Sequence, residues 1–95
     1  MDIAKVFQHH PTGKQIVVIR DEDSEDGSPS ISVLVEPDGL GICANRFGYP
    51  DTESGWLKRD EMFEERFTEE EVQKIASRII DAASALTSSQ PSSPP

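Results

Sequence analysis

Four short segments in the first half of the chain have the residue pattern of β-strands. They span residues 3–8, 15–20, 30–36 and 40–47. Residues 3–8 are rich in β-forming residues, and in residues 30–36 Ile31, Val33 and Val35 alternate with Ser32, Leu34 and Glu36, which is typical of a strand with one buried face. In residues 40–47, Leu40, Ile42 and Ala44 would share one face, with Cys43 and Phe47 on the other. The second segment instead contains the β-branched run Ile16-Val17-Val18-Ile19, which is typical of a central strand. We therefore expect a sheet of three or four strands.

Turn-forming residues separate these segments. Residues 9–13 contain proline and glycine, and residues 21–29 are polar and charged, so we expect the second connector to be mobile at its tip. The sequence Glu36-Pro37-Asp38-Gly39 has proline at the second position of a tight turn and glycine at the fourth. This turn predicts that the strands on either side of it pair antiparallel.

Residues 56–67 fit two structures equally well. They could form a short helix, in which Phe63 and Phe67 lie one turn apart, or a further strand that begins at Trp56. Short apolar patterns do not distinguish these alternatives.

The clearest local signal predicts a helix over residues 68–86. Thr68 and Glu71 form a capping box, and Phe67 with Val72 forms a hydrophobic staple. Apolar residues then recur at helical spacing: Val72, Ile75, Ala76, Ile79, Ala83 and Leu86. Residues 87–95 contain mainly serine and proline, which predicts a disordered tail.

These elements predict an α+β fold, as one domain over residues 1–86. We expect an antiparallel meander of three to four strands, with one C-terminal amphipathic helix packed on one face. A single helix covers only part of one sheet face, so Val17, Ile19 and Leu34 would be left without cover.

Composition agrees with one small domain that contains no membrane segment. The chain has 95 residues, of which 35% are hydrophobic, and no apolar run approaches the ~18 residues of a membrane span. The first residues lack the pattern of a signal peptide, and the single cysteine, Cys43, forms no intramolecular disulfide. A cytoplasmic location is the simplest expectation.

The net charge of −9 is concentrated in two acidic blocks. The first contains Asp21, Glu22, Asp23, Glu25 and Asp26, and the second contains Asp60, Glu61, Glu64, Glu65, Glu69, Glu70 and Glu71. Such a field repels nucleic-acid phosphates and anionic membranes and attracts basic proteins. Glu69 to Glu71 also stabilise the start of a helix, whereas the other acids have no evident local use. We therefore expect the other acids to face a partner.

Catalytic and metal-binding motifs fail on spacing. His9 and His10 are adjacent, and the sequence has no further zinc ligands at a suitable spacing from them. We therefore expect both to be turn histidines that are partly exposed to solvent. Residues 21–27 do not fit the helix-loop-helix calcium template in either register, so at most a weak divalent site is expected there. No nucleophile, base and orienting acid can be assembled, so we expect no enzyme and no cofactor.

An aromatic loop is a further candidate for binding. Arg46, Tyr49 and Trp56 are of the residue types enriched at binding hot spots. In the alternative interpretation, Phe47 and Trp56 close the open end between sheet and helix.

Two main hypotheses follow. In the first, the protein is a small acidic interaction module that binds the basic surface of a partner, and an inhibitor is one form of such a module. It would be similar in size and charge to the nucleic-acid mimics of phages and mobile elements, although no motif supports that likeness. In the second, it is a structural subunit that forms a homodimer through its sheet. An enzyme or divalent-cation protein is the third class, and it would require a pocket with converging polar groups.

Overall fold

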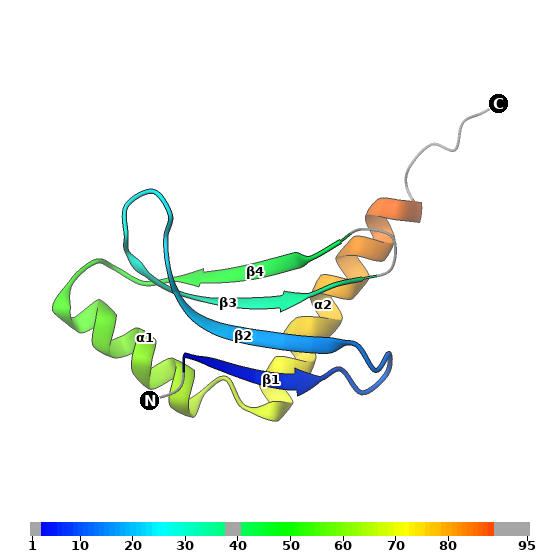
Figure 1. Ribbon diagram of the computed structural model, residues 1–95, viewed down its shortest axis with the longest axis horizontal. Helices are drawn as coiled ribbons and strands as arrows, with labels where there is room; N and C mark the ends of the chain where they lie inside the picture. The colour runs from blue at the N-terminus through cyan, green and yellow to red at the C-terminus, as the bar shows by residue number, and fades with distance from the viewer. Residues whose placement is uncertain (1–2, 38–40, 89–95) are drawn as a thin grey trace.

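Four antiparallel strands form one sheet in the computed structural model, which describes residues 3–37 and 41–88 of the chain. The strands are β1 (Ala4–Gln8), β2 (Gln15–Glu22), β3 (Pro29–Val35) and β4 (Cys43–Gly48). Their order in the sheet is the order in the chain, β1-β2-β3-β4 (Figure 1). The predicted α+β class and sequential meander are confirmed.

The connector between β2 and β3 is shorter than predicted. Strand β2 continues to Glu22, and its last two residues, Asp21 and Glu22, pair with Ser30 and Pro29 of β3. The expectation that Asp21 and Glu22 belong to a loop is therefore wrong, because main-chain pairing extends the strand into the acidic block. Residues 23–28 form the remaining connector.

The strand expected from residue 40 is observed only from Cys43. Gly41 has a φ of 69°, a backbone conformation that suits glycine and not a strand. Part of the predicted turn at residues 36–39 and the predicted start of this strand lie at residues 38–40, outside the described residues.

Two helices follow the sheet, so the expectation of one helix is wrong. Helix α1 spans Glu53–Glu65 and resolves the ambiguous segment in favour of a helix. It begins after Thr52, whose Oγ1 accepts a hydrogen bond from the Gly55 amide at 3.0 Å. Such a cap satisfies one of the free amide groups of the first turn.

Helix α2 spans Glu69–Ser88 and begins as predicted. Thr68 Oγ1 accepts a hydrogen bond from the Glu71 amide at 3.4 Å, and Phe67 and Val72 are both buried in the core. The helix extends two residues beyond the predicted boundary at residue 86. The rest of the predicted tail, residues 89–95, lies outside the described residues.

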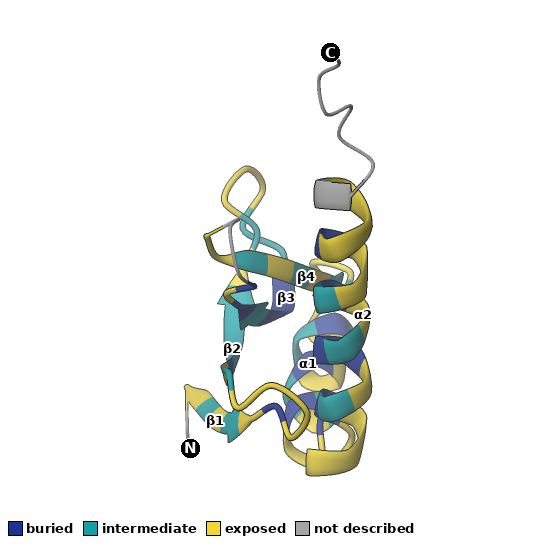
Figure 2. Cartoon of the chain, turned by 90° about the vertical axis from the view of Figure 1, so that its right-hand side faces the viewer, coloured by how far each residue is buried: buried dark blue, intermediate teal, exposed yellow. Residues whose placement is uncertain are grey.

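The core lies between one face of the sheet and both helices. Figure 2 shows α1 and α2 on the same side of the sheet. The buried cluster combines alternate strand residues with residues of the helices and their connection: Ile16, Val18, Ile31, Val33, Val35, Phe63, Phe67, Val72, Ile75, Ala76 and Ile79. Neither described helix lies over the opposite face of the sheet. Over the described residues, neither helix has the length and hydropathy needed to cross a membrane.

Candidate interaction surfaces

The side chains of alternate strand residues point away from the helices and form what we call the open face. Antiparallel register places Val6 beside Val17, Val17 beside Leu34, and Leu34 beside Ala44, in one row across all four strands. Ile19 lies in the next row, between Ala4 and Ser32. The larger apolar side chains of the open face, with Ala44, are Val6, Val17, Ile19, Leu34 and Ile42, which include the three residues predicted to lack cover.

A shallow groove of about 430 Å³ runs over the centre of the open face. Its apolar lining consists of Val17, Ile19, Leu34, Val35 and Ile42, and its polar lining of Lys14, Gln15 and Glu36. Val6 and Ile42 are 61% and 69% exposed, so water contacts most of the surface of these two apolar side chains. Exposed apolar side chains grouped in this way are typical of an interaction site.

Opposite charges lie at both ends of the open face. Lys14 and Glu36 line the groove where β2 begins and β3 ends. At the other end, Arg46 Nη2 lies 4.0 Å from Asp21 Oδ2, and Arg46 Nε donates a hydrogen bond to Ser32 Oγ at 3.4 Å. Among the described residues, two basic and two acidic side chains therefore flank the apolar centre.

The acids of the hairpin connector stabilise its own turn. Asp23 Oδ1 accepts hydrogen bonds from the amides of Glu25 and Asp26, at 2.8 and 3.2 Å. Hydrogen bonds from the Ser28 side chain and main chain lower the pKa of Asp26 below its ordinary value, because they favour the ionised carboxylate. The expectation that these acids have no local use is wrong for Asp23 and Asp26. Glu22 and Glu25 are exposed.

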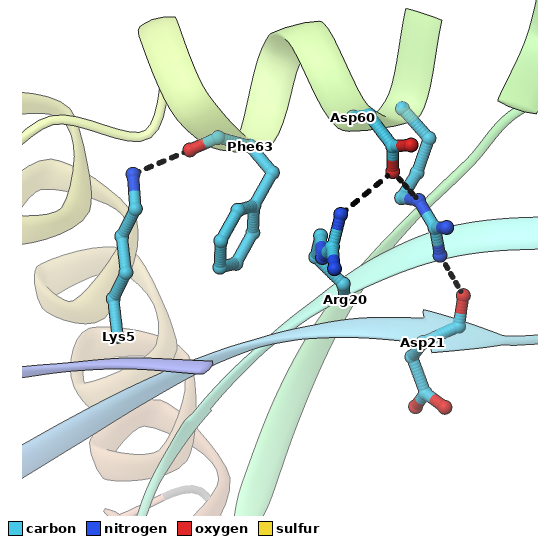
Figure 3. Close-up of polar contacts among 6 residues, drawn as sticks. Lys5, Arg20, Asp21, Asp60 and Phe63 are labelled. Atoms are coloured by element: carbon cyan, nitrogen blue, oxygen red, sulfur yellow. Dashed lines mark hydrogen bonds and ion pairs between the residues drawn. The ribbon is translucent and has the colours of Figure 1, made fainter. Parts of the chain in front are cut away.

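Polar contacts attach α1 to the sheet (Figure 3). Asp60 Oδ1 accepts hydrogen bonds from Arg20 Nη1 at 3.2 Å and from Arg59 Nε at 2.8 Å. Arg59 Nη1 also donates to the main-chain oxygen of Asp21 at 2.8 Å. Asp60 is therefore a structural residue, and the expectation that it has no local use is wrong.

Phe63 completes this attachment. Lys5 Nζ donates a hydrogen bond to the Phe63 main-chain oxygen and lies 4.7 Å from the centre of the Phe63 ring, and Arg20 approaches the same ring at 5.5 Å. Both distances are within the range of cation–π contacts. Sequence reasoning missed this role of Lys5, Arg20 and Arg59, since hydrophobic periodicity contains no signal for it.

The two acidic blocks come close at Arg59, but their carboxylates diverge. Arg59 contacts Asp60 and the main chain of Asp21, whereas the carboxylate of Asp21 points away from α1 (Figure 3). It accepts a hydrogen bond from Ser32 Oγ at 3.3 Å at the end of the open face. Asp21 and Asp60 thus do not present their charges on one surface.

Exposed glutamates continue along the helices. Glu61, Glu64 and Glu65 are exposed and spaced to share one side of α1, which we call the acidic ridge. Within the described residues these three have no ion-pair partner. In the first turn of α2, by contrast, Glu70 and Glu71 lie 3.8 and 3.5 Å from Lys74 Nζ.

The residues of the predicted aromatic site are not brought together. Arg46 lies at the open face, whereas Tyr49 lines a groove of about 480 Å³ beside the helices, with Phe47 and Phe67. The ring centres of Phe47 and Phe67 lie 5.4 Å apart in an edge-to-face contact, and Phe47 packs against the core. This placement of Phe47 agrees with the alternative interpretation, in which it closes the open end between sheet and helix. Burial raises the pKa of Tyr49.

Trp56 makes local contacts at the start of α1. Its Nε1 donates to Asp51 Oδ1 at 2.9 Å, and Arg59 lies 5.0 Å from the centre of the Trp56 rings. The prediction that Trp56 closes the core is not confirmed, since Trp56 lies outside the buried cluster and the residues packed on it.

The histidines and the cysteine do not form a reactive centre in the described structure. His9 is buried, with hydrogen bonds of 2.8 Å to Thr12 and to Ser77 of α2, so the expectation that it is solvated is wrong. His10 is exposed, and Cys43 is half-buried at the start of β4. Among the described residues, no three His, Cys, Asp or Glu side chains are placed to hold a metal ion.

The described chain is thus a two-layer α+β domain with one layer of helices and one open sheet face. Comparison with protein-family models, with curated proteins and with solved structures gives no match to this chain.

Proposed function

We propose that this protein is a small non-catalytic assembly subunit that binds another protein through the open face of its sheet. The observation that supports the proposal is the placement of both helices on the same side of the sheet. Two helices could cover two faces, but no described helix covers the second face, where Val6 and Ile42 are exposed and Val17, Ile19 and Leu34 are half-buried. The second hypothesis drawn from the sequence, a structural subunit that forms a homodimer through its sheet, is one form of this function.

The chemistry of the open face suits a protein partner better than a small substrate. Its centre is aliphatic, and its groove is shallow, with charged side chains only at the two ends. A flat apolar patch with a polar rim is the usual composition of a protein interface. Catalysis requires converging polar groups in a pocket, which the centre of this face does not offer.

A second candidate function is the acidic interaction module, for which the acidic ridge is the supporting observation. Glu61, Glu64 and Glu65 are exposed on one side of α1 and are not needed to attach that helix to the sheet. Carboxylates displayed in this way favour arginine- and lysine-rich partners. Asp60, Asp23 and Asp26 make structural contacts within the chain. The acidic surface available to a partner therefore contains fewer residues than predicted.

Site-specific photo-cross-linking tests the proposed function. A photoreactive phenylalanine analogue replaces Val6 on the open face or, as the matched control, Leu57, which is a similarly exposed apolar residue on α1. After irradiation in cells that express the full chain, we expect covalent protein adducts from position 6 and none from position 57. Equal yields at the two positions, or no adduct at position 6, would contradict the proposal.

A third probe position tests the second candidate function, the acidic interaction module, separately from the first. The analogue at Glu64 should give adducts only if the acidic ridge binds a partner. Because exposed charges are screened by salt, those adducts should disappear when lysates are irradiated at high salt, whereas adducts at position 6 should persist.

A further inference from the structure

We infer that the free edge of β4 binds an extended segment of another protein, which adds a strand to the sheet and places an acidic side chain beside Arg78. This edge is a different surface from the open face, so the inference goes beyond the proposed function. It is supported by the direction of the main-chain groups of β4, by two hollows between β4 and α2, and by the charge of Arg78.

The main-chain groups of every second residue of β4 point away from the sheet. The Tyr49 amide donates a hydrogen bond to the Pro29 main-chain oxygen at 2.9 Å, in register with the pairing of β3 and β4. In an antiparallel pair, residues that bond to the neighbouring strand alternate with residues that point away from it. The residues whose amides and carbonyls are turned to the free edge are therefore Ala44, Arg46 and Gly48. All three are exposed, and no strand of the described chain pairs with them.

The other edge of the sheet, formed by β1 (Figure 1), is partly closed by α2. The Gln8 main-chain oxygen points away from the sheet and accepts a hydrogen bond from Gln73 Nε2 at 2.8 Å. A side chain of the protein thus takes an acceptor that an added strand would need. Among the described residues, no side chain makes such a bond to the free edge of β4. Since a sheet edge that is not covered offers a template for a further strand, β4 is the edge at which one can add.

Two hollows lie between β4 and α2, where the helix layer meets the free edge. The first, of about 380 Å³, is lined by the start of β4 and by the apolar side chains of Ile79, Ala82, Ala83 and Leu86. The second, of about 480 Å³, lies at the end of β4, beside Phe47 and Tyr49. Leu86 is 65% exposed, so the first hollow has apolar surface still in contact with water.

An added strand would direct its side chains into these hollows. Every second side chain of β4 is turned to the helices, at Cys43, Asn45 and Phe47, and the side chains of an added strand opposite these three residues would be turned the same way. The first and third of them would lie over the two hollows. In such strand addition the main chain supplies affinity and pockets for alternate side chains supply specificity.

Arg78 lines both hollows and so lies near the middle of the site. It is exposed, and within the described structure it has no ion-pair partner, because Glu71, which also lines the second hollow, lies 3.5 Å from Lys74 Nζ instead. The middle side chain of the partner should therefore be acidic. Neither edge strand of this chain, β1 or β4, contains an acidic residue, so a second copy would not supply one.

The chemistry of the partner follows from these features. Residues 44–48 span roughly 14 Å at ~3.4 Å per residue, so about five residues of the partner pair with β4. Alternate residues of that segment are apolar, acidic and apolar. The net charge of −9 disfavours a segment that carries further acids.

Selection of a random nine-residue peptide library on the immobilised full chain tests the inference. We expect enrichment of peptides with an apolar, an acidic and an apolar residue at alternate positions. Enrichment of no sequence, or of sequences without this alternation, would overturn the inference.

A pair of matched proline variants tests whether the enriched peptides pair with β4. Ala44→Pro removes an amide that is turned to the free edge and keeps the bonds of β4 to β3, so it should weaken peptide binding roughly tenfold or more. Ala4→Pro makes the same change on the free edge of β1, because the neighbouring Ile3 bonds to β2, and should leave binding unchanged. Equal affinities of the two variants, measured by fluorescence anisotropy, would place the peptide elsewhere.

N-methylated peptides provide the same test on the wild-type protein, should Ala44→Pro fail to fold. Methylation of one alternate set of peptide amides should abolish binding, because that set faces β4, whereas methylation of the other set should not. An equal effect of both sets would contradict strand addition.

The role of Arg78 is tested by its charge. Arg78→Gln should weaken binding of the acidic peptides roughly two- to fivefold, as expected of a surface ion pair, and should not affect peptides in which the acid is replaced by its amide. Lys58→Gln removes the same charge from an exposed residue of α1 and should change neither affinity. An equal loss for both peptides would exclude the ion pair with Arg78.

A second copy of the chain at this edge is a distinguishable outcome. A wild-type dimer in sedimentation equilibrium that Ala44→Pro dissociates, without peptide enrichment, would assign the edge to self-association and overturn the inference. Circular dichroism of each variant confirms that it is folded before its affinity is interpreted.

Discussion

Asp60 accepts hydrogen bonds from Arg20 and Arg59, whose side chains are 14% and 10% exposed. Neighbouring Glu61 is exposed and belongs to the acidic ridge. Two adjacent acids of one helix thus have unrelated roles, because the helix turns one toward the sheet and the other toward water.

Replacing Asp60 by asparagine should lower the free energy of unfolding by about 1–3 kcal/mol, because two largely buried guanidinium groups lose their charged acceptor. Glu61→Gln removes the same charge from the next residue and should change stability by less than about 0.5 kcal/mol. Urea denaturation of both variants measures the difference. Equal stability of the two variants would mean that the Asp60 contacts contribute nothing to the attachment of α1.

Among the elements, α1 packs on the rest of the chain through its main chain as well as through side chains. A Cβ atom built on Gly55 would lie 1.8 Å from the main-chain oxygen of Pro50, so the first turn of α1 rests directly on the preceding chain. Gly55 is buried, and only glycine fits this approach.

Gly55→Ala should therefore destabilise the protein by about 1–3 kcal/mol, because the helix must move away from Pro50. Gly48→Ala is the matched control, since a Cβ atom there would meet nothing within 4 Å. Thermal unfolding should show a clear loss for the first variant and a change near zero for the second. The opposite ranking would contradict the close packing of this turn.

The elements that the sequence predicted well are those whose signals are local. Local patterns located the four strands, the buried face of β3 and the start of α2, since each depends on neighbouring residues, whereas the end of β2 and the start of β4 were predicted wrongly. Helix α1 could not be distinguished from a strand because it is held by Arg59, Asp60 and Phe63 through contacts with distant residues, while its apolar Leu57 is exposed. The open face was foreseen at Val17, Ile19 and Leu34, but both helices lying on one side was not.

At the scale of the whole molecule, charge opposes compactness. The net charge of −9 over 95 residues favours any state in which the acids lie further apart. The acidic ridge, with Glu69 to Glu71 close behind it in the chain, concentrates this repulsion on the helices.

Raising salt should therefore stabilise the monomer. Between ~0.01 and ~1 M salt the screening length falls from ~30 to ~3 Å, whereas the partly buried contacts of Asp60 are screened much less. A gain of about 0.5 kcal/mol would raise the Tm by roughly 2–4 °C in a domain of this size. Scanning calorimetry at low protein concentration measures it, and the triple variant Glu61→Gln, Glu64→Gln and Glu65→Gln should show a smaller increase. A Tm that falls with salt would contradict this account.

Because each strand pairs with its predecessor in the chain, the sheet also has a simple route of assembly. Successive hairpins form by closing short loops, and the entropy lost on closure grows with loop length. Contacts between distant parts of the chain, such as those of His9 with Ser77 and of Lys5 with Phe63, attach the helices to the sheet. These contacts can form after the strands have paired. Local pairing of this kind favours rapid folding, and it leaves the aliphatic side of the sheet in water from the first hairpin onward.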